Sequence, residues 1–303
     1  MTVIDVTEPE FRALFAEVST WGHWGDQAER GALNHITPSR IAGAARLVQT
    51  GVTVTLSHPL ETEKRIEVPE PAEHHMTMMP DQDIGSGSVR FAKDYIGLDY
   101  HNEGHTHLDA FSHVVFDARL YDGRSVDTIT ADGAGFGAVD ALKDGLVGRG
   151  VLLDIPRSRG VPWLEPGEHV RTDDLEAAEA QQSVRVSAGD VLLVRTGHAR
   201  RLAETQGWDP TQAKAGLHPT AASFLADRAI AVLGSDGNND TAPSTTEGIA
   251  FPIHVLALNA IGIPLLDYLQ LEDLARSGAP RSSAGNFCSR LRRCGSSAAP
   301  GRR

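Results

Sequence analysis

The sequence has little cysteine and no long apolar run. Its 303 residues include two cysteines, Cys288 and Cys294, which excludes a disulfide framework and a four-cysteine zinc site. No uninterrupted apolar stretch reaches the roughly 20 residues that cross a bilayer. The N-terminal segment MTVIDVTEPEFRALF also lacks the basic and then apolar pattern of a secretion signal. We therefore expect a cytoplasmic protein with no membrane partner.

Basic residues are also scarce. Lys and Arg number 28 against 40 Asp and Glu, which gives a formal net charge of -12. Nucleic acids and anionic membranes are normally bound through a basic surface, so neither is the expected partner. The hydrophobic content of 41% is ordinary for a globular protein. A small-molecule substrate is the expected ligand.

The order of predicted elements indicates one mixed α/β (α+β) domain over residues 1–275. Helices are expected up to about Ala16 and over residues 36–51, 171–182 and 217–228. The apolar runs GRGVLLDIP, GDVLLVRTGH and AIAVLGSDG are compatible with buried strands, and VTVTLSHPL alternates like a strand. Residues 61–90 are rich in Pro, Glu, Met and Gly, which predicts a long loop.

Residues 101–113, HNEGHTHLDAFSH, hold four histidines, a glutamate and an aspartate. Side chains two residues apart share one face of an extended strand. The face that this alternation predicts carries Glu103, His105, His107 and Asp109, with His101 joining further back. His113 follows a predicted bend, where it can act as a general base. The alternative is a polar loop of solvated histidines, but the density of imidazole and carboxylate favours a divalent-metal site.

The segment THLDAFSH resembles the His-x-Gly-Thr-His-x-Asp-x-Pro-x-His signature of the metal-dependent cyclase family, which includes bacterial kynurenine formamidase and isatin hydrolase. Other segments look like the actinobacterial and fungal branch of that family: WGHWGDQAERGALNHITPSRIAGAARLV, GVLLDI, GDVLLVRTGH, LGSDGNND and FPIHVLALNAIGIPLLDYLQLEDLA. The resemblance implies a swivelling β/β/α fold, one or two divalent ions and hydrolysis of an amide-like bond, as in arylformamidases. It also implies a homo-oligomer, a homodimer or homotetramer.

The resemblance assigns roles at the centre of the cluster. His107 falls on a metal-ligand histidine, Asp109 on the aspartate that can bridge two metals, and His113 on the histidine that moves the proton. A bound divalent cation lowers the pKa of water from about 15.7 to as little as roughly 7 and polarises the carbonyl under attack. His113 can then take the proton from water and return it to the leaving nitrogen.

Other ligand positions depart from the family pattern. The family's first ligand histidine falls on Glu103, and the register leaves open whether His101 or His105 substitutes for it. The later ligands fall on His254 and on Asp267 or its neighbourhood. A shell richer in carboxylate favours manganese or magnesium over zinc, and the three stay open.

Trp21 and Trp24 can form an aromatic wall for a planar substrate, as the resemblance also suggests, or they can fill core. Asp236 can support the ligands or cap a turn, and turn chemistry is favoured. Two other functions stay open. One is a cyclase or dehydratase acting on a polyketide-like substrate, and the other is a non-catalytic binding relative that has lost one metal ligand.

The tail, residues 276–303, holds seven arginines and no acidic residue. Similar chains usually continue here with a strand resembling Trp-Glu-Phe-Leu. The codons TGG GAA TTT CTG, read one base out of register, encode Gly-Asn-Phe-Cys, the residues at 285–288. We therefore hypothesise a frameshift shortly after Leu274, which predicts a poorly ordered tail and no metal or redox role for either cysteine.

Overall fold

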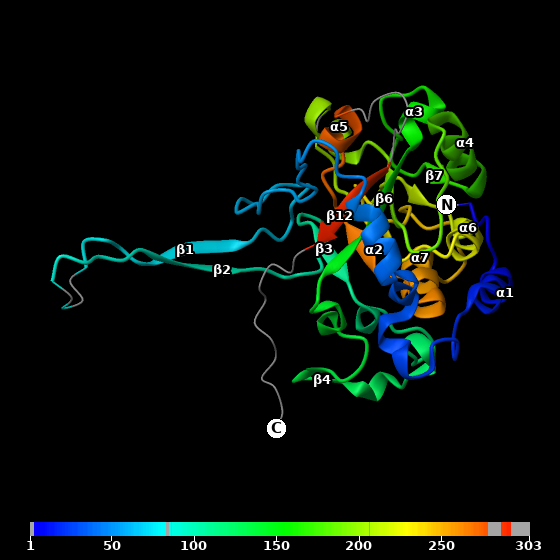
Figure 1. Cartoon of the computed structure of the whole chain (residues 1–303), viewed down its shortest axis with the longest axis horizontal. Coiled ribbons are helices and arrows are strands. Elements are labelled where there is room, and N and C mark those ends of the chain that lie inside the picture. Colours follow the sequence, from blue (N-terminus) through cyan, green and yellow to red (C-terminus); the bar gives the residue numbers. More distant parts are fainter. Residues whose placement is uncertain (1–2, 83–84, 86, 206, 278–285, 292–303) are drawn as a thin grey trace.

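The computed structural model describes residues 3–82, 85, 87–205, 207–277 and 286–291 (Figure 1). Its centre is a six-stranded sheet in the order β12-β6-β8-β10-β11-β3. The strands are β3 (His107–Asp109), β6 (Leu146–Asp154), β8 (Val191–Arg195), β10 (Val232–Ser235), β11 (Leu265–Asp267) and β12 (Asn286–Leu291). The four inner strands run parallel, and β3 and β12 pair antiparallel at the two edges. This confirms the mixed α/β fold.

Both faces of the parallel strands are buried. In β8, Leu192 and Val194 belong to one apolar cluster, whereas Val191 and Leu193 belong to a second cluster on the opposite face. Strands covered on both faces have continuous apolar sequences because every side chain is buried. That is why the three predicted runs are confirmed as β6, β8 and β10.

Helices cover the two faces (Figure 1). They are α1 (Glu8–Val18), α2 (Pro38–Ala45), α3 (Ile155–Arg159), α4 (Thr172–Gln182), α5 (His198–Glu204), α6 (Ala221–Asp227), α7 (Pro252–His254) and α8 (Glu272–Arg276). A π-helix, η6 (Val255–Ile261), continues directly from α7, and all of its residues are buried. Among the described residues, no helix is both long and apolar enough to span a membrane.

Two predictions on the N-terminal third need correction. Residues 52–60 form no regular strand, although Ser57 makes an isolated bridge to Leu269. The expected loop over residues 61–90 contains strand β1 (Glu73–Met78), which pairs antiparallel with β2 (Lys93–Gly97). This hairpin projects far from the body of the protein (Figure 1). Its side chains have no core to cover, so apolar periodicity gave no signal for it.

The tail differs in part from expectation. Residues 286–291 form strand β12, whose register pairs Asn286 with Val151 and Leu291 with Leu146 of β6. Backbone pairing at a sheet edge needs no particular side chain, which explains how a segment of unusual composition can occupy it. Residues 278–285 and 292–303 lie outside the described residues, and the frameshift stays a hypothesis.

Polar residues gather where the parallel strands end, at their carboxyl ends. Asp267 ends β11 and pairs in register with His107, which begins the antiparallel strand β3. Both therefore lie at the edge where the parallel strands end. Ligand sites of α/β sheets form at this edge because the loops that follow the strands diverge there.

Candidate metal centre

Two groups of three potential metal ligands share Asp109. One consists of His101, His107 and Asp109, and the other of Asp109, His113 and His254. Within each group the ligand atoms lie within 4.8 Å of one another. The two carboxylate oxygens face different groups: Oδ1 is 2.6 Å from His101 Nδ1, and Oδ2 is 3.4 Å from His254 Nε2. Asp109 thus has the placement of a bridging ligand.

Strand β3 is shorter than the alternation predicts. His107 and Asp109 share a face of the sheet, but residues 101–106 form a turn in which Asn102 Oδ1 accepts a hydrogen bond from Gly104 N at 2.7 Å. The turn returns His101 to Asp109. His105 stays outside both groups and is buried.

Glu103 lies with a buried lysine. Its two carboxylate oxygens are 3.0 and 2.9 Å from Nζ of Lys214, which is 1% exposed and also lies 3.3 Å from the Tyr268 hydroxyl. A buried ammonium group is costly unless a counter-charge pairs with it, and Glu103 supplies that charge. The side chain that this segment brings to the cluster is His101, whereas Glu103 is absent from both ligand groups among the described residues.

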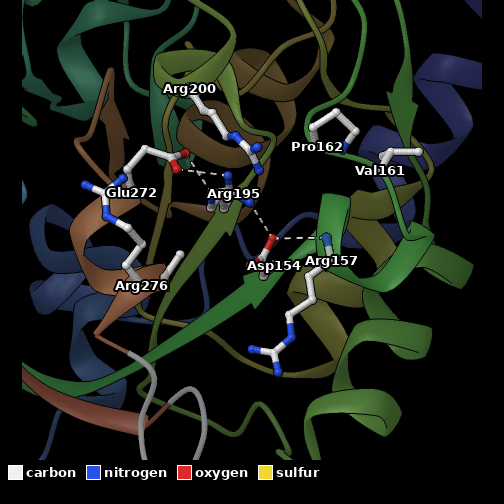
Figure 2. A pocket seen from close by; sticks show the side chains of 9 residues that line it. Asp154, Arg157, Val161, Pro162, Arg195, Arg200, Glu272 and Arg276 are labelled. Atoms are coloured by element: carbon white, nitrogen blue, oxygen red, sulfur yellow. Dashed lines mark hydrogen bonds and ion pairs between the residues drawn. The ribbon is translucent and has the colours of Figure 1, made fainter. Parts of the chain in front are cut away.

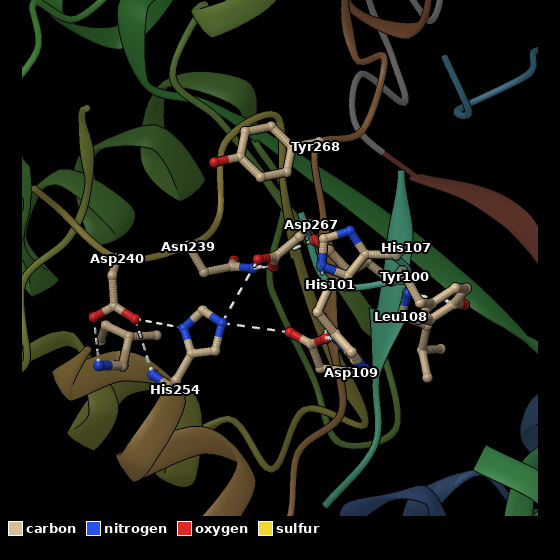
Figure 3. Close-up of polar contacts among 12 residues, drawn as sticks. Tyr100, His101, His107, Leu108, Asp109, Asn239, Asp240, His254, Asp267 and Tyr268 are labelled. Atoms are coloured by element: carbon tan, nitrogen blue, oxygen red, sulfur yellow. Dashed lines mark hydrogen bonds and ion pairs between the residues drawn. The ribbon is translucent and has the colours of Figure 1, made fainter. Parts of the chain in front are cut away.

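His254 is held by a second carboxylate that the sequence did not single out (Figure 3). Its Nδ1 lies 2.6 Å from Asp240 Oδ2, and the same carboxylate accepts the backbone N–H groups of Ile253 and His254 at 2.7 and 3.1 Å. Asp240 therefore caps α7 and fixes the ring, so that Nε2 faces Asp109. A carboxylate on the outer nitrogen is typical of metal-binding histidines.

Two further contacts orient ligands in the same way. The Nδ1 of His107 lies 2.7 Å from the carbonyl oxygen of His105, which leaves Nε2 toward Asp109 at 3.6 Å. Asn239 donates a hydrogen bond to Asp267 Oδ1 at 2.6 Å, while Asp267 Oδ2 lies 3.6 Å from His254 Nε2. Asn239 and Asp240 follow Asp236 in the segment SDGNND, where their local density of polar residues was the available signal.

The cluster gathers three buried carboxylates. Asp109, Asp240 and Asp267 are each at most 1% exposed. Burial alone would raise the pKa of Asp109, but contacts with His101 and His254 hold it well below its usual range. Burial and the charge of Asp109 raise the pKa of Asp267 well above its usual range.

His254 carries the compensating charge in the metal-free protein. Burial opposes its protonation, but the carboxylates of Asp109 and Asp240 raise its pKa well above the ordinary value. Asp109 Oδ2 is buried and, beyond its 3.4 Å ion pair with His254 Nε2, has no hydrogen-bond partner among the described residues. An orphaned carboxylate oxygen beside imidazole nitrogens fits a divalent cation, because such an ion accepts both donor types and compensates the charge.

His113 ends the short helix η2 (Phe111–His113) and stacks on His101, with ring centroids 3.9 Å apart. Desolvation lowers the pKa of His113 to about 4, although the charge of Asp109 partly opposes this. The imidazole is therefore neutral near pH 7, as proton acceptance and metal binding both require. Its assignment as the base stays a prediction, because its ring also lies within one ligand group.

The two tryptophans pack on the body of the protein. Trp21 donates its indole N–H to the Asn259 carbonyl at 2.6 Å and meets Phe15 edge to face. Trp24 lies between His23 and His35. Their role in substrate binding stays a prediction.

Other aromatic rings lie closer to the ligands. Tyr100 contacts the rings of His101 and His107 at 5.2 and 5.8 Å, and Phe251 lies 5.7 Å from His254. Tyr268 lies 6.3 Å from His107 and has a left-handed backbone with φ of 52°. This conformation is a strained outlier for a bulky residue, and such strain clusters at functional sites. Sequence reasoning missed these residues because nothing in their local pattern marks them.

Asp236 has a structural part. It accepts hydrogen bonds from the backbone N–H groups of Thr196, Gly197 and His198 and from the Thr196 hydroxyl, at 2.7 to 3.0 Å. The carboxylate therefore caps the start of α5, in agreement with the turn chemistry favoured from the sequence.

The comparison with known families agrees with this geometry. The sequence model of the Cyclase family, described as "Putative cyclase", matches residues 54–239, which is more than half of the chain. The chain belongs to the Cyclase family. A search of the curated proteins found no match.

Solved structures extend the likeness of this Cyclase family member over nearly its whole length. A crystal structure of a novel cyclase has a TM-score of 0.80 and 29% identity, and covers 90% of this chain and 91% of its own. Isatin hydrolase A from Ralstonia solanacearum has a TM-score of 0.52 and 23% identity, over 78% of this chain and 85% of its own. An isatin hydrolase bound to the product analogue thioisatinate gives 0.53 and 17%, over 85% and 100%. The isatin hydrolases show a common fold.

Proposed function

We propose that this Cyclase family member is a metal-dependent hydrolase that cleaves an amide-like bond in a small aromatic or cyclic substrate. The observation that carries the proposal is the pair of ligand groups that share the buried Asp109. One of them includes His254, whose ring is oriented by Asp240. A structural ion pair needs no such convergence of imidazole and orphaned carboxylate oxygen. The fold common to this chain and the isatin hydrolases supports the choice of bond.

A divalent ion, zinc or manganese with magnesium as a third choice, would polarise the substrate carbonyl and lower the pKa of water. The groups that would hold it are His101, His107, Asp109, His254 and Asp267. Two neighbouring residues hold these ligands in place. Asp240 keeps the His254 ring turned toward Asp109, and Asn239 fixes the Asp267 carboxylate by its hydrogen bond.

His113 moves the proton in this proposal. Its pKa of about 4 keeps the imidazole neutral at pH 7, so it can accept the proton of the attacking water. The protonated ring then returns that proton to the leaving nitrogen, which would otherwise depart as a poor leaving group. Tyr100 and Phe251 are exposed beside the ligand histidines and offer apolar faces to a planar substrate.

A substrate panel tests the proposal. Protein loaded with manganese or with zinc is incubated with isatin, N-formylkynurenine and a saturated cyclic amide, and the masses of the products are measured by mass spectrometry. Hydrolysis adds the mass of one water to a cyclic amide, splits N-formylkynurenine into kynurenine and formate, and should require the metal. Loss of one water from a polyketide-like substrate would instead identify a cyclase or dehydratase. A protein that stays free of metal after manganese or zinc supplementation would favour the binding relative.

A further inference from the structure

A cavity lies at the ends of β6 and β8, apart from the two ligand groups of the metal centre (Figure 2). Its volume is about 310 Å³, and none of the candidate metal ligands is among the described residues that line it. Sites for small organic molecules usually have volumes of roughly 300–1,000 Å³, so the cavity can hold one such molecule. It also lies at the carboxyl ends of parallel strands, where ligand sites of α/β sheets form.

Four arginines from four different segments line this cavity. Arg195 ends β8, whereas Arg157, Arg200 and Arg276 belong to α3, α5 and α8. The described lining also includes two carboxylates, so the arginines leave an excess of two positive charges. The whole chain has a formal net charge of -12, so this excess is local. A cavity lined by an excess of one sign of charge attracts a ligand of the opposite sign.

Both carboxylates are already engaged by the buried Arg195. The two oxygens of Glu272 accept hydrogen bonds from Arg195 at 2.7 and 3.0 Å, and Asp154 Oδ1 accepts a third at 2.7 Å. Arg195 is only 5% exposed. A guanidinium group has five N–H donors, and these bonds use three of them. Within the described part of the chain, two N–H donors of a buried cation therefore remain for a ligand.

The other three arginines are free to turn toward a ligand. Arg200 pairs with Glu204 at 2.7 Å and Arg276 pairs with Asp273 at 2.5 Å, each within its own helix and with side chains at least 41% exposed. Exposed pairs of this kind contribute little to stability, so an anion can replace them at low cost. The guanidinium of Arg157 makes no ion pair with any residue that the structure describes.

The cavity also has an apolar side. Val161 and Pro162 line it, and Val161 is 42% exposed (Figure 2). The guanidinium of Arg200 lies over the ring of Trp163, the next residue along, at 5.8 Å from the ring centroid. This cation–π contact holds Arg200 beside the apolar side chains. A ligand with both an anionic group and a hydrocarbon part fits such a lining better than a bare inorganic ion does.

We propose that this cavity binds a small organic anion, whose carboxylate or phosphate group contacts the arginines and whose hydrocarbon part contacts Val161 and Pro162. The planar guanidinium suits either group, because it can donate two parallel hydrogen bonds to a pair of oxygens. A divalent cation does not suit the cavity, since Arg195 occupies both carboxylates. The proposal does not rest on the proposed function, because the cavity and the metal centre share no ligand residue.

Calorimetric titration with three ligands of similar size tests the binding. The full chain is titrated at low ionic strength with benzoate, phenyl phosphate and benzamide, which has the ring of benzoate without its charge. We expect at least one anion to bind at one site per chain, and benzamide to bind roughly tenfold more weakly or less. Binding of benzoate alone identifies a carboxylate site, and binding of phenyl phosphate alone identifies a phosphate site. Failure of both anions to bind, or equal binding of benzamide, would overturn the proposal.

Variants locate the bound anion. Arg157→Gln/Arg200→Gln removes two exposed arginines of the cavity and keeps Arg195 with its buried partners. The matched control is Arg12→Gln/Arg46→Gln, which removes the same charge from two exposed arginines elsewhere; Arg12, like Arg200, pairs with a glutamate four residues away. We expect the cavity variant to bind the anion roughly tenfold more weakly, and the control to bind it as the wild type does.

Asp109→Asn then separates this cavity from the metal centre, where a carboxylate or phosphate could bind to a metal ion. It should bind the anion as the wild type does. Loss of anion binding in Asp109→Asn, or unchanged binding in the cavity variant, would place the anion elsewhere and overturn the proposal. Metal binding that fails while the cavity still binds the anion would refute the proposed function alone.

Discussion

Two charged clusters lie at the carboxyl ends of the parallel strands, and they differ in how their charge is balanced. At the ends of β6 and β8, Arg195 binds Asp154 at 2.7 Å and Glu272 at 2.7 and 3.0 Å, beside a cavity of about 310 Å³ (Figure 2). At the ends of β10 and β11, the buried carboxylates of Asp109, Asp240 and Asp267 lie around the imidazole of His254 (Figure 3).

The difference teaches how to tell a structural ion pair from a metal site. The guanidinium of Arg195 satisfies both carboxylates with directed hydrogen bonds, and together they raise its pKa against the effect of burial. The cluster around His254 gives Asp109 Oδ2 a 3.4 Å ion pair with His254 Nε2 but, among the described residues, no directed hydrogen bond. Buried carboxylate charge that the protein itself does not satisfy indicates an external cation.

The largest expected effect comes from removing the central charge of the metal cluster. Asp109→Asn removes the negative charge that both groups share and one of the two oxygens, so we expect loss of bound metal and a fall in turnover on the order of 10³ or more. Asp240→Asn is the matched variant, because it removes a supporting carboxylate of equal burial. It should keep measurable metal and lose about 10- to 100-fold. Elemental analysis and kinetics give both readings, and full metal content in Asp109→Asn would contradict the assignment.

The second prediction separates proton transfer from ligation. His113→Ala should retain the metal content of the wild type and lose about 10² to 10⁴ in turnover, because a positioned base contributes that much. Metal content and turnover are measured on the same preparation. A loss of one metal equivalent would instead make His113 a ligand of the second group.

The third prediction concerns the balanced cluster. Arg195→Met leaves Asp154 and Glu272 buried without a counter-charge, so the free energy of unfolding should fall by about 3–5 kcal/mol. Metal affinity should not change. Urea denaturation and metal titration measure the two effects. The triple variant Asp154→Asn/Arg195→Met/Glu272→Gln removes all three charges and should recover most of the loss, and failure to recover would argue against charge balance as the cause.

The fourth prediction distinguishes Glu103 from His101. Glu103→Gln removes the partner of the buried Lys214, so stability should fall by about 1–3 kcal/mol while metal affinity stays within about threefold. His101→Ala should do the reverse and weaken metal binding at least tenfold. Thermal unfolding and calorimetry compare them. Weakened metal binding in Glu103→Gln with none in His101→Ala would restore Glu103 as the ligand.

The smallest expected effect depends on pH and lies outside both clusters. Burial, and then the charge of Arg171, lower the pKa of His218 to about 4. Since an unfolded histidine titrates near 6.5, stability is present above pH 6.5 and is lost as the pH falls toward 4. Between pH 7 and pH 5, the wild type should lose about 1–2 kcal/mol more than His218→Asn. Equal losses in urea denaturation would show that the pKa of His218 is not lowered in the folded protein.

The parts of the site that depend on contacts between residues close in sequence could be predicted, and those that depend on contacts between distant residues could not. The alternation that places His107 and Asp109 on one face is a local property of strands, and the structure has it. It failed upstream because Asn102 and Gly104 make a turn, which brings His101 rather than Glu103 to the cluster. The part played by Asp240 could not be read from the sequence, because it depends on a hydrogen bond to a residue 14 positions away.

The elements of the fold also divide into those that the sequence predicted and those that it did not. Strands β6, β8 and β10 were predictable because burial on both faces demands continuous apolar sequence. The hairpin and residues 52–60 were not, since exposed backbone follows no burial pattern. In these segments apolar residues such as Val52 are exposed.

The π-helix η6 determines how far the chain turns between His254 and the strand that carries Asp267. In a π-helix each turn holds an additional residue compared with an α-helix, and such turns are frequent at functional sites. The segment Val255–Ile261 separates His254 from the strand that ends at Asp267. If one residue were deleted from it, the shortened segment could close as an ordinary α-helix. Because each residue of an α-helix turns the chain by about 100°, the imidazole and the carboxylate would then face different directions. The length of this segment is therefore as much a part of the site as its ligands, and substitution and deletion there are different experiments.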